Sequence, residues 1–132
     1  MIVLDTHAWI WWLRRSPELS PHVAELLDQA DQLVLPSIVI WEVAMLVRKQ
    51  RLQLPADQDL DLFVRIALAH SRTRLWPLTP GIGIRAGMIG PQLHGDPADR
   101  LIVATALELG APLATRDERI TSAAIPGLLT AW

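Results

Sequence analysis

The hydrophobic positions of the chain fall into short apolar runs and into longer stripes with a helical period. Residues 2–5 and 32–37 are compact apolar runs, the pattern of strands buried inside a sheet. Residues 20–30 instead repeat apolar side chains every three or four positions, after a Ser20-Pro21 pair that is typical of a helix start. The two patterns alternate, which predicts strands separated by helices.

The same alternation continues to the end of the chain. Helices are predicted over residues 6–14, 37–51, 60–69, 79–90 and 96–110, with strands over 74–78, 111–115 and 125–132. Ser37 and Asp96 are the expected N-caps of their helices, and Gly110 supplies a C-terminal stop. We therefore predict an α/β fold with a mainly parallel central sheet flanked by helices, forming one domain over residues 1–132.

Composition narrows the class of protein. Of 132 residues, 51% are hydrophobic and 20% charged, which argues against wholesale disorder, and the lack of cysteine excludes disulfides, thiolate metal sites and a cysteine nucleophile. Asp5 and His7 interrupt the apolar N-terminus, so we expect no signal peptide, no membrane association and a cytoplasmic location. The net charge of −2 disfavours a purely electrostatic nucleic-acid binder, yet permits a nuclease whose carboxylates bind metal.

Four acidic residues occupy corresponding places in this pattern. Asp5 ends the first strand, Glu42 lies early in the helix after the second, Asp99 in the first turn of the 96–110 helix, and Asp117 just beyond the fourth strand. In a parallel sheet, strand ends and the starts of the following helices share one edge, where ligands bind. Taken singly, Glu42 could be a solvated helix residue, Asp99 a favourable charge at a helix start, and Asp117 a loop acid.

If the four acids converge, they resist ionisation together unless a cation joins them. Mg²⁺ suits a few carboxylates and several waters, and such sites activate water against phosphodiesters. The four histidines have no spacing typical of a zinc site. The pattern thus indicates a carboxylate-bound divalent metal.

Three segments carry a family resemblance: "IVLDTHAWIWWL", "SIVIWEVAMLVRKQRLQLP" and "HGDPADRLIVATALELGAPLATRDERI". Together they resemble PIN-domain ribonucleases, more narrowly the VapC-type toxins of bacterial toxin–antitoxin modules. The resemblance implies an endoribonuclease that depends on Mg²⁺ or Mn²⁺ and is restrained by a cognate antitoxin. It places the metal-binding and catalytic acids at Asp5, Glu42, Asp99 and Asp117. It also implies that the hydroxyls of Thr6 and Thr115 hydrogen-bond to those acids or to water held by the metal.

Further expectations concern the surface. Arg100 is a candidate RNA phosphate contact, and Gly95 stands where related sequences often carry a basic residue. The apolar early helices, with Trp11 opposite Trp9, predict a homodimer and a groove for an apolar antitoxin segment. The alternative function is a non-catalytic PIN scaffold that binds RNA or a protein partner. A receiver-like signalling domain is disfavoured because the only lysine, Lys49, lies inside a predicted helix.

Overall fold

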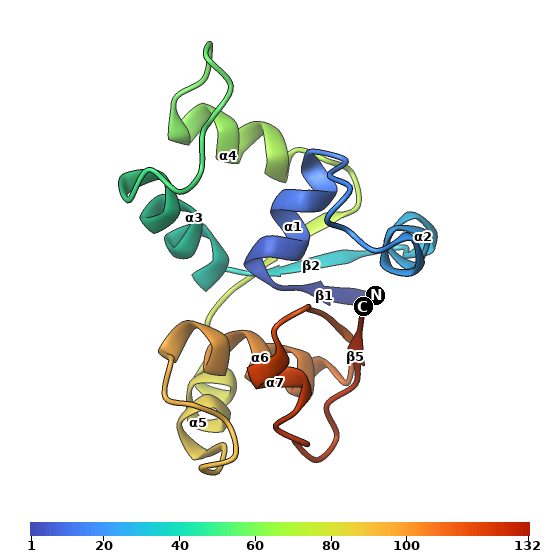
Figure 1. Ribbon diagram of the computed structural model, residues 1–132. Helices are drawn as coiled ribbons and strands as arrows, with labels where there is room; N and C mark the ends of the chain where they lie inside the picture. The colour runs from blue at the N-terminus through green and yellow to red at the C-terminus, as the bar shows by residue number, and fades with distance from the viewer.

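A computed structural model describes residues 1–132 as a five-stranded sheet surrounded by seven helices (Figure 1). The elements follow the chain in the order β1 (Ile2–Leu4), α1 (Thr6–Leu13), α2 (Pro21–Gln29), β2 (Leu33–Pro36), α3 (Ile38–Arg48), α4 (Leu60–Leu68), β3 (Thr73–Trp76), α5 (Pro80–Met88), α6 (Pro97–Leu109), β4 (Leu113–Ala114), α7 (Glu118–Thr121) and β5 (Thr130–Ala131). The predicted α/β alternation is confirmed. No helix combines the length and apolar character needed to cross a bilayer.

The strands lie in the order β3-β2-β1-β4-β5, and every neighbouring pair is parallel. Val3 in the central strand β1 is opposite Val34 on one side and Leu113 on the other. In Figure 1, α1, α3 and α4 lie above the sheet, α5, α6 and α7 lie below it, and the two termini are close together. A sheet covered on both faces explains why its central strands are apolar at every position.

Helix α6 shows how local sequence positions a functional residue. The carboxylate of Asp96 accepts a hydrogen bond from the Asp99 amide at 3.1 Å, and Gly110 ends the helix with a left-handed φ of 58°. Both features agree with the sequence prediction, since a cap side chain and a C-terminal glycine satisfy otherwise unpaired backbone groups. Asp99 is thereby held in the first turn, at the carboxyl-end edge of the sheet.

Helix α3 differs from its prediction at both ends. Ser37 does not cap it: the residue already has a helical backbone, and its hydroxyl donates to the Trp76 carbonyl at 2.9 Å instead. The helix ends at Arg48 rather than continuing to residue 51, because Gln50 adopts a positive φ of 57°. The short helix α7 was not predicted, because four residues are too few to show a helical period.

Candidate active site

Asp5 connects the central strand to the first helix. It follows β1 directly and is the N-cap of α1, where its carboxylate accepts a hydrogen bond from the Ala8 amide at 2.6 Å. The side chain is buried, with 9% of the residue exposed. Burial raises the pKa of Asp5, while the Thr115 hydroxyl and the Ala8 amide lower it in part. Its carboxylate therefore has hydrogen bonds but contacts no arginine or lysine.

Glu42 reaches the same region from α3, which lies beside α1 on the same face of the sheet (Figure 1). Its carboxylate accepts a short hydrogen bond from the hydroxyl of Thr6, the first residue of α1. Burial raises the pKa of Glu42 to about 7, and repulsion from Asp99, Asp96 and Asp5 adds to the rise. Like Asp5, this carboxylate is paired with a neutral donor.

Asp99 and Asp117 form the other half of the site and share one cation, Arg119. The Arg119 guanidinium donates to Asp117 at 2.7 and 3.1 Å and reaches Asp99 at 3.4 Å. Hydrogen bonds from Arg119 hold the pKa of Asp117 below its usual range. Burial, with repulsion from Asp96 and Asp117, raises the pKa of Asp99 to about 6 despite this partner.

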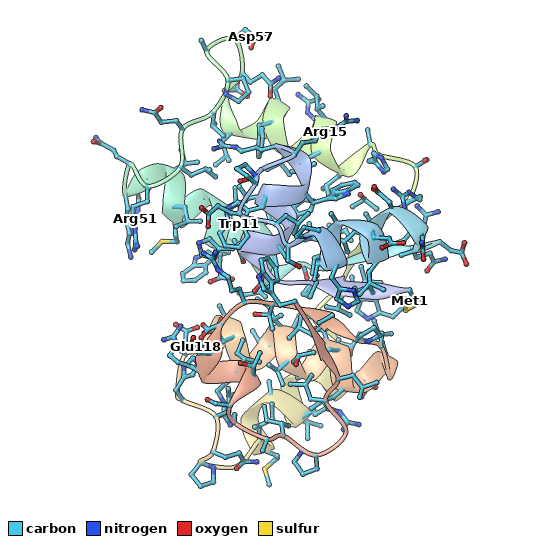
Figure 2. All side chains as sticks on the ribbon, turned by 45° about the vertical axis from the view of Figure 1, so that its right-hand side comes forward. Met1, Trp11, Arg15, Arg51, Asp57 and Glu118 are labelled. Carbon is cyan, nitrogen blue, oxygen red and sulfur yellow. The ribbon has the colours of Figure 1, made fainter.

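The four acids predicted to converge do so. They line one pocket of about 370 Å³ at the carboxyl-end edge of the sheet. The other lining residues are Thr6, His7, Trp11, Asp96, Ile102, Arg116 and Arg119. Thr115 is buried beneath it, where its hydroxyl accepts a hydrogen bond from the Asp117 amide at 3.1 Å. Figure 2 shows Trp11 in the upper layer and Glu118, the residue before Arg119, in the lower one.

One wall of the pocket is an aromatic cluster around Trp11. The Arg116 guanidinium lies 4.4 Å from the Trp11 ring centre and pairs with Glu18 at 2.7 Å, while Trp132 packs edge-on at 5.5 Å. Trp9 is fully buried in the core. Trp11 and Trp12 of α1 remain partly exposed, and the expected apolar surface on the early helices stays a prediction. The strongly exposed apolar side chains are elsewhere, on α3, α4 and α5 and near residue 129.

Arg100 does not line the pocket. Its guanidinium donates to the backbone carbonyls of Ala86 at 3.0 Å, Leu93 at 3.1 Å and Ile89, tying α6 to the end of α5. An arginine fully used by carbonyls is not available to a phosphate, so the expected RNA contact is replaced by a structural role. No pattern in the sequence indicates these partners, because they are backbone carbonyls at the end of α5 and in the loop after it.

Two residues near the acids were not predicted as part of the site. His94 places Nε2 3.3 Å from an Asp99 oxygen, and that nitrogen is buried without a hydrogen-bond partner. Ligand atoms of His94, Asp99 and Asp117 all lie within 4.8 Å of one another. Arg119 is the second. The only sequence signal for Arg119 is its position two residues after Asp117. The only signal for His94 is its position in the loop that leads into α6.

Comparison with known proteins agrees with this geometry. The PIN-domain family model matches residues 2–126. The chain belongs to the PIN-domain family. It is also 36% identical over 131 residues to ribonuclease VapC22 of Mycobacterium tuberculosis, covering 99% of this chain and 98% of that protein.

Solved structures with the same PIN fold include two toxin–antitoxin assemblies. The VapBC2 structure of Rickettsia felis, bound to a promoter DNA fragment, has a TM-score of 0.72 at 21% identity, covering 100% of this chain and 99% of that one. A toxin–antitoxin complex from Klebsiella pneumoniae has a TM-score of 0.69 at 21% identity, covering 100% and 98%. At this identity the likeness establishes the fold, which is the predicted one.

The donor set of this PIN-domain pocket fits a hard divalent cation. Oxygen ligands predominate, and the elevated pKa values of Asp5, Glu42 and Asp99 indicate a site with too little positive charge for its carboxylates. Of the two arginines that line the pocket, only Arg119 contacts the acids, and it reaches only Asp99 and Asp117. A divalent cation would supply the missing charge to the whole set.

Proposed function

We propose that this PIN-domain protein is an endoribonuclease that hydrolyses RNA phosphodiester bonds, and that it is the toxin of a toxin–antitoxin pair. The observation that carries the proposal is the convergence of four carboxylates from four separate elements in one pocket. Sequence relationship to a protein named as a VapC ribonuclease, over nearly its whole length, supports RNA as the substrate.

The residues proposed to hold Mg²⁺ or Mn²⁺ are Asp5, Glu42, Asp99 and Asp117. Bound there, the cation would activate a water and offset charge on the leaving oxygen. The chain's own residues prepare the pocket. Asp5 is fixed by the Ala8 amide, and Glu42 is oriented by Thr6. Such hydrogen bonds hold carboxylates in place and reduce the reorganisation needed on binding.

Arg116 is proposed to help bind the RNA. It lines the pocket, and its position is set by Trp11 on one side and Glu18 on the other. A fixed guanidinium beside an acidic pocket can hold a phosphate by paired hydrogen bonds while the carboxylates act on the neighbouring bond. This residue takes the place of Arg100 as the proposed phosphate contact.

We further propose a cognate antitoxin and a homodimer as partners. The related solved structures include VapBC and other toxin–antitoxin complexes, which supports an antitoxin. Ile84 and Met88 of α5 are 69% and 79% exposed, which makes α5 a second candidate for the dimer contact beside the early helices. Light scattering on the purified wild type and on Met88→Glu tests this proposal. A wild type that is a monomer at tens of micromolar, with Met88→Glu unchanged from it, would contradict the dimer.

The function is tested by incubating purified protein with structured and unstructured RNA, with Mg²⁺, with Mn²⁺ and with excess EDTA. We expect metal-dependent internal cleavage that leaves 5′-phosphate and 3′-hydroxyl ends, the outcome of direct attack by water. Cleavage that persists in EDTA, or 2′,3′-cyclic phosphate ends, would contradict the proposal. RNA binding without cleavage under all conditions would favour the non-catalytic scaffold.

A further inference from the structure

Arg119 is the one arginine or lysine that contacts any of the four acids directly, and it contacts two of them. Its Nε lies 3.1 Å from Asp117 Oδ1, and its Nη2 lies 2.7 Å from Asp117 Oδ2 and 3.4 Å from Asp99 Oδ2. The Arg119 backbone amide also donates to Asp117 Oδ1 at 2.8 Å. The guanidinium thus joins two carboxylates that come from different elements, α6 and the start of α7.

These contacts use the oxygens that a cation would need. Both oxygens of Asp117 accept from Arg119, and the Asp99 oxygen nearest Arg119 is the one that His94 also approaches. A guanidinium and a divalent ion cannot occupy the space between the same two carboxylates, because both are positive and both need the same lone pairs. Metal binding to this pair therefore requires Arg119 to move.

Nothing else in the chain holds Arg119 in place. Its side chain is 63% exposed, and its hydrogen bonds are made only to Asp117 and Asp99. The two other arginines near the pocket are anchored, Arg100 by backbone carbonyls and Arg116 by Glu18 and Trp11. Arg119 alone can turn into solvent by side-chain rotation, without a change in the backbone.

We propose that Arg119 is a built-in competitor of the metal, a resident counter-ion that spans Asp99 and Asp117 until a divalent cation displaces it. The inference rests on the metal site of the proposed function and adds a specific regulation to it. The metal-free protein keeps one cation between two of its acids, and the affinity for metal is lowered by the free energy of that contact. Because the contact is largely exposed, its effect is moderate.

The experiment is calorimetric titration of Mn²⁺ into metal-free protein, in the wild type, in Arg119→Gln and in Arg119→Lys. The glutamine variant is expected to bind Mn²⁺ roughly three- to tenfold more tightly, and the lysine variant to fall in between, since one ammonium cannot bridge both acids as a guanidinium does. Arg65→Gln is the matched control. It removes the same charge from an exposed arginine of α4 that pairs with Asp61 at 2.9 Å, so its Mn²⁺ affinity should equal that of the wild type.

Thermal melting supplies a second readout that does not need enzyme activity. Without metal, Arg119→Gln should melt below the wild type, because Asp99 and Asp117 lose their counter-ion; with saturating Mn²⁺ the difference should shrink. Mn²⁺ binding to Arg119→Gln that equals or is weaker than binding to the wild type would overturn the inference and leave the metal site standing. Absence of Mn²⁺ binding in every protein would overturn both.

Discussion

The two halves of the acidic pocket are stabilised by different chemistry. Asp5 and Glu42 are paired with neutral donors, an amide and two threonine hydroxyls, whereas Asp99 and Asp117 share the charged Arg119. The pKa of Glu42 rises to about 7, whereas Arg119 holds that of Asp117 below its usual range; Asp99, which Arg119 reaches less closely and which is more buried, still has a pKa raised to about 6. A hydroxyl satisfies a carboxylate's hydrogen-bonding capacity but does not balance its charge.

The difference between the two halves explains why a divalent cation bound from solution is needed. Arg119 serves only one half of the pocket, so the neutral half remains short of positive charge in the metal-free protein. A divalent cation between the halves would serve both. The predictions below test each half separately, from the largest expected effect to the smallest.

The largest effect is expected from the neutral half. Asp5→Asn keeps the shape and the capping oxygen but removes the charge, so we expect RNA cleavage to fall at least about a thousandfold, since metal ions contribute several kcal/mol to such reactions. The variant should remain folded, because a buried, uncompensated carboxylate becomes neutral. The measurement is single-turnover cleavage with a circular-dichroism check of folding.

Asp57→Asn is the control for that substitution. Asp57 is exposed in the loop between α3 and α4, at the far end of the molecule from Glu118 (Figure 2). The Asp57→Asn variant should cleave RNA at the same rate as the wild type. Comparable losses in both variants would show that general charge, rather than the pocket, governs the activity.

Metal is expected to stabilise the fold by mass action. Saturation at a hundredfold excess of Mn²⁺ over Kd should raise the free energy of unfolding by about 2.7 kcal/mol, because the cation binds the folded pocket only. Asp99→Asn should reduce this stabilisation by metal, because it removes one of the carboxylates proposed to bind the cation. Differential scanning calorimetry with and without Mn²⁺ measures both, and a melting temperature indifferent to metal in the wild type would refute a metal site.

The next prediction concerns the hydroxyl that orients Glu42. Thr6→Val preserves the β-branched shape in a buried position but removes the donor to Glu42. We expect Mn²⁺ affinity to fall roughly 10-fold, the lower end of the usual effect of losing a hydrogen bond to a metal ligand. Thr6→Ser retains the hydroxyl and should bind Mn²⁺ nearly as well as the wild type. Equal affinities for all three proteins would show that Thr6 does not orient the ligand.

The smallest effect is a pH dependence of the metal-free protein. The pKa values of Glu42 and Asp99 are about 7 and 6, above their ordinary values of 4.5 and 3.8. At a pH between the ordinary and the raised pKa of either group, the folded state therefore binds more protons than the unfolded state. The free energy of unfolding therefore rises as pH falls from 8 towards 5. The lowered pKa of Asp117 acts in the opposite sense, but only below about pH 5.

We expect the melting temperature without metal to rise by roughly 2–5 °C over that range. Glu42→Gln removes one of the acids whose pKa is raised and should flatten the profile, which isolates the contribution of Glu42. A wild-type melting temperature that falls steadily from pH 8 to 5, with the same slope in Glu42→Gln, would be inconsistent with a carboxylate that resists ionisation.

Much of this architecture could be predicted because it depends on strand direction. Asp5 and Asp117 follow strands of a parallel sheet, and Glu42 lies early in the helix after β2, so topology brings these three to one edge. Asp99 reaches the same edge because α6 follows α5 and runs back to β4, with its first turn at the carboxyl ends of the strands. Capping by Asp96 could likewise be read from its place before Pro97. The convergence of the acids and the helix cap depend on the path of the backbone, and the hydrophobic pattern of the sequence predicts that path.

The partners of individual side chains could not be predicted in the same way. Arg119 was not predicted although it lies two residues after Asp117, and Arg100 was expected to contact RNA although it binds carbonyls of α5 and of the loop after it. Trp11 is covered by Arg116 and by Trp132, which are far from it in sequence. These contacts depend on rotamers and irregular loops over distances of a few ångströms, and no periodic pattern encodes them.

The central claim, that the two halves of the pocket share a divalent cation, is tested most directly by anomalous diffraction from crystals soaked in Mn²⁺. We predict an anomalous peak in the pocket, about 2.0–2.2 Å from carboxylate oxygens contributed by both halves, with the Arg119 guanidinium turned away from Asp99 and Asp117. Peaks found only at exposed acids such as Asp57, with Arg119 still bridging its two partners, would contradict the account.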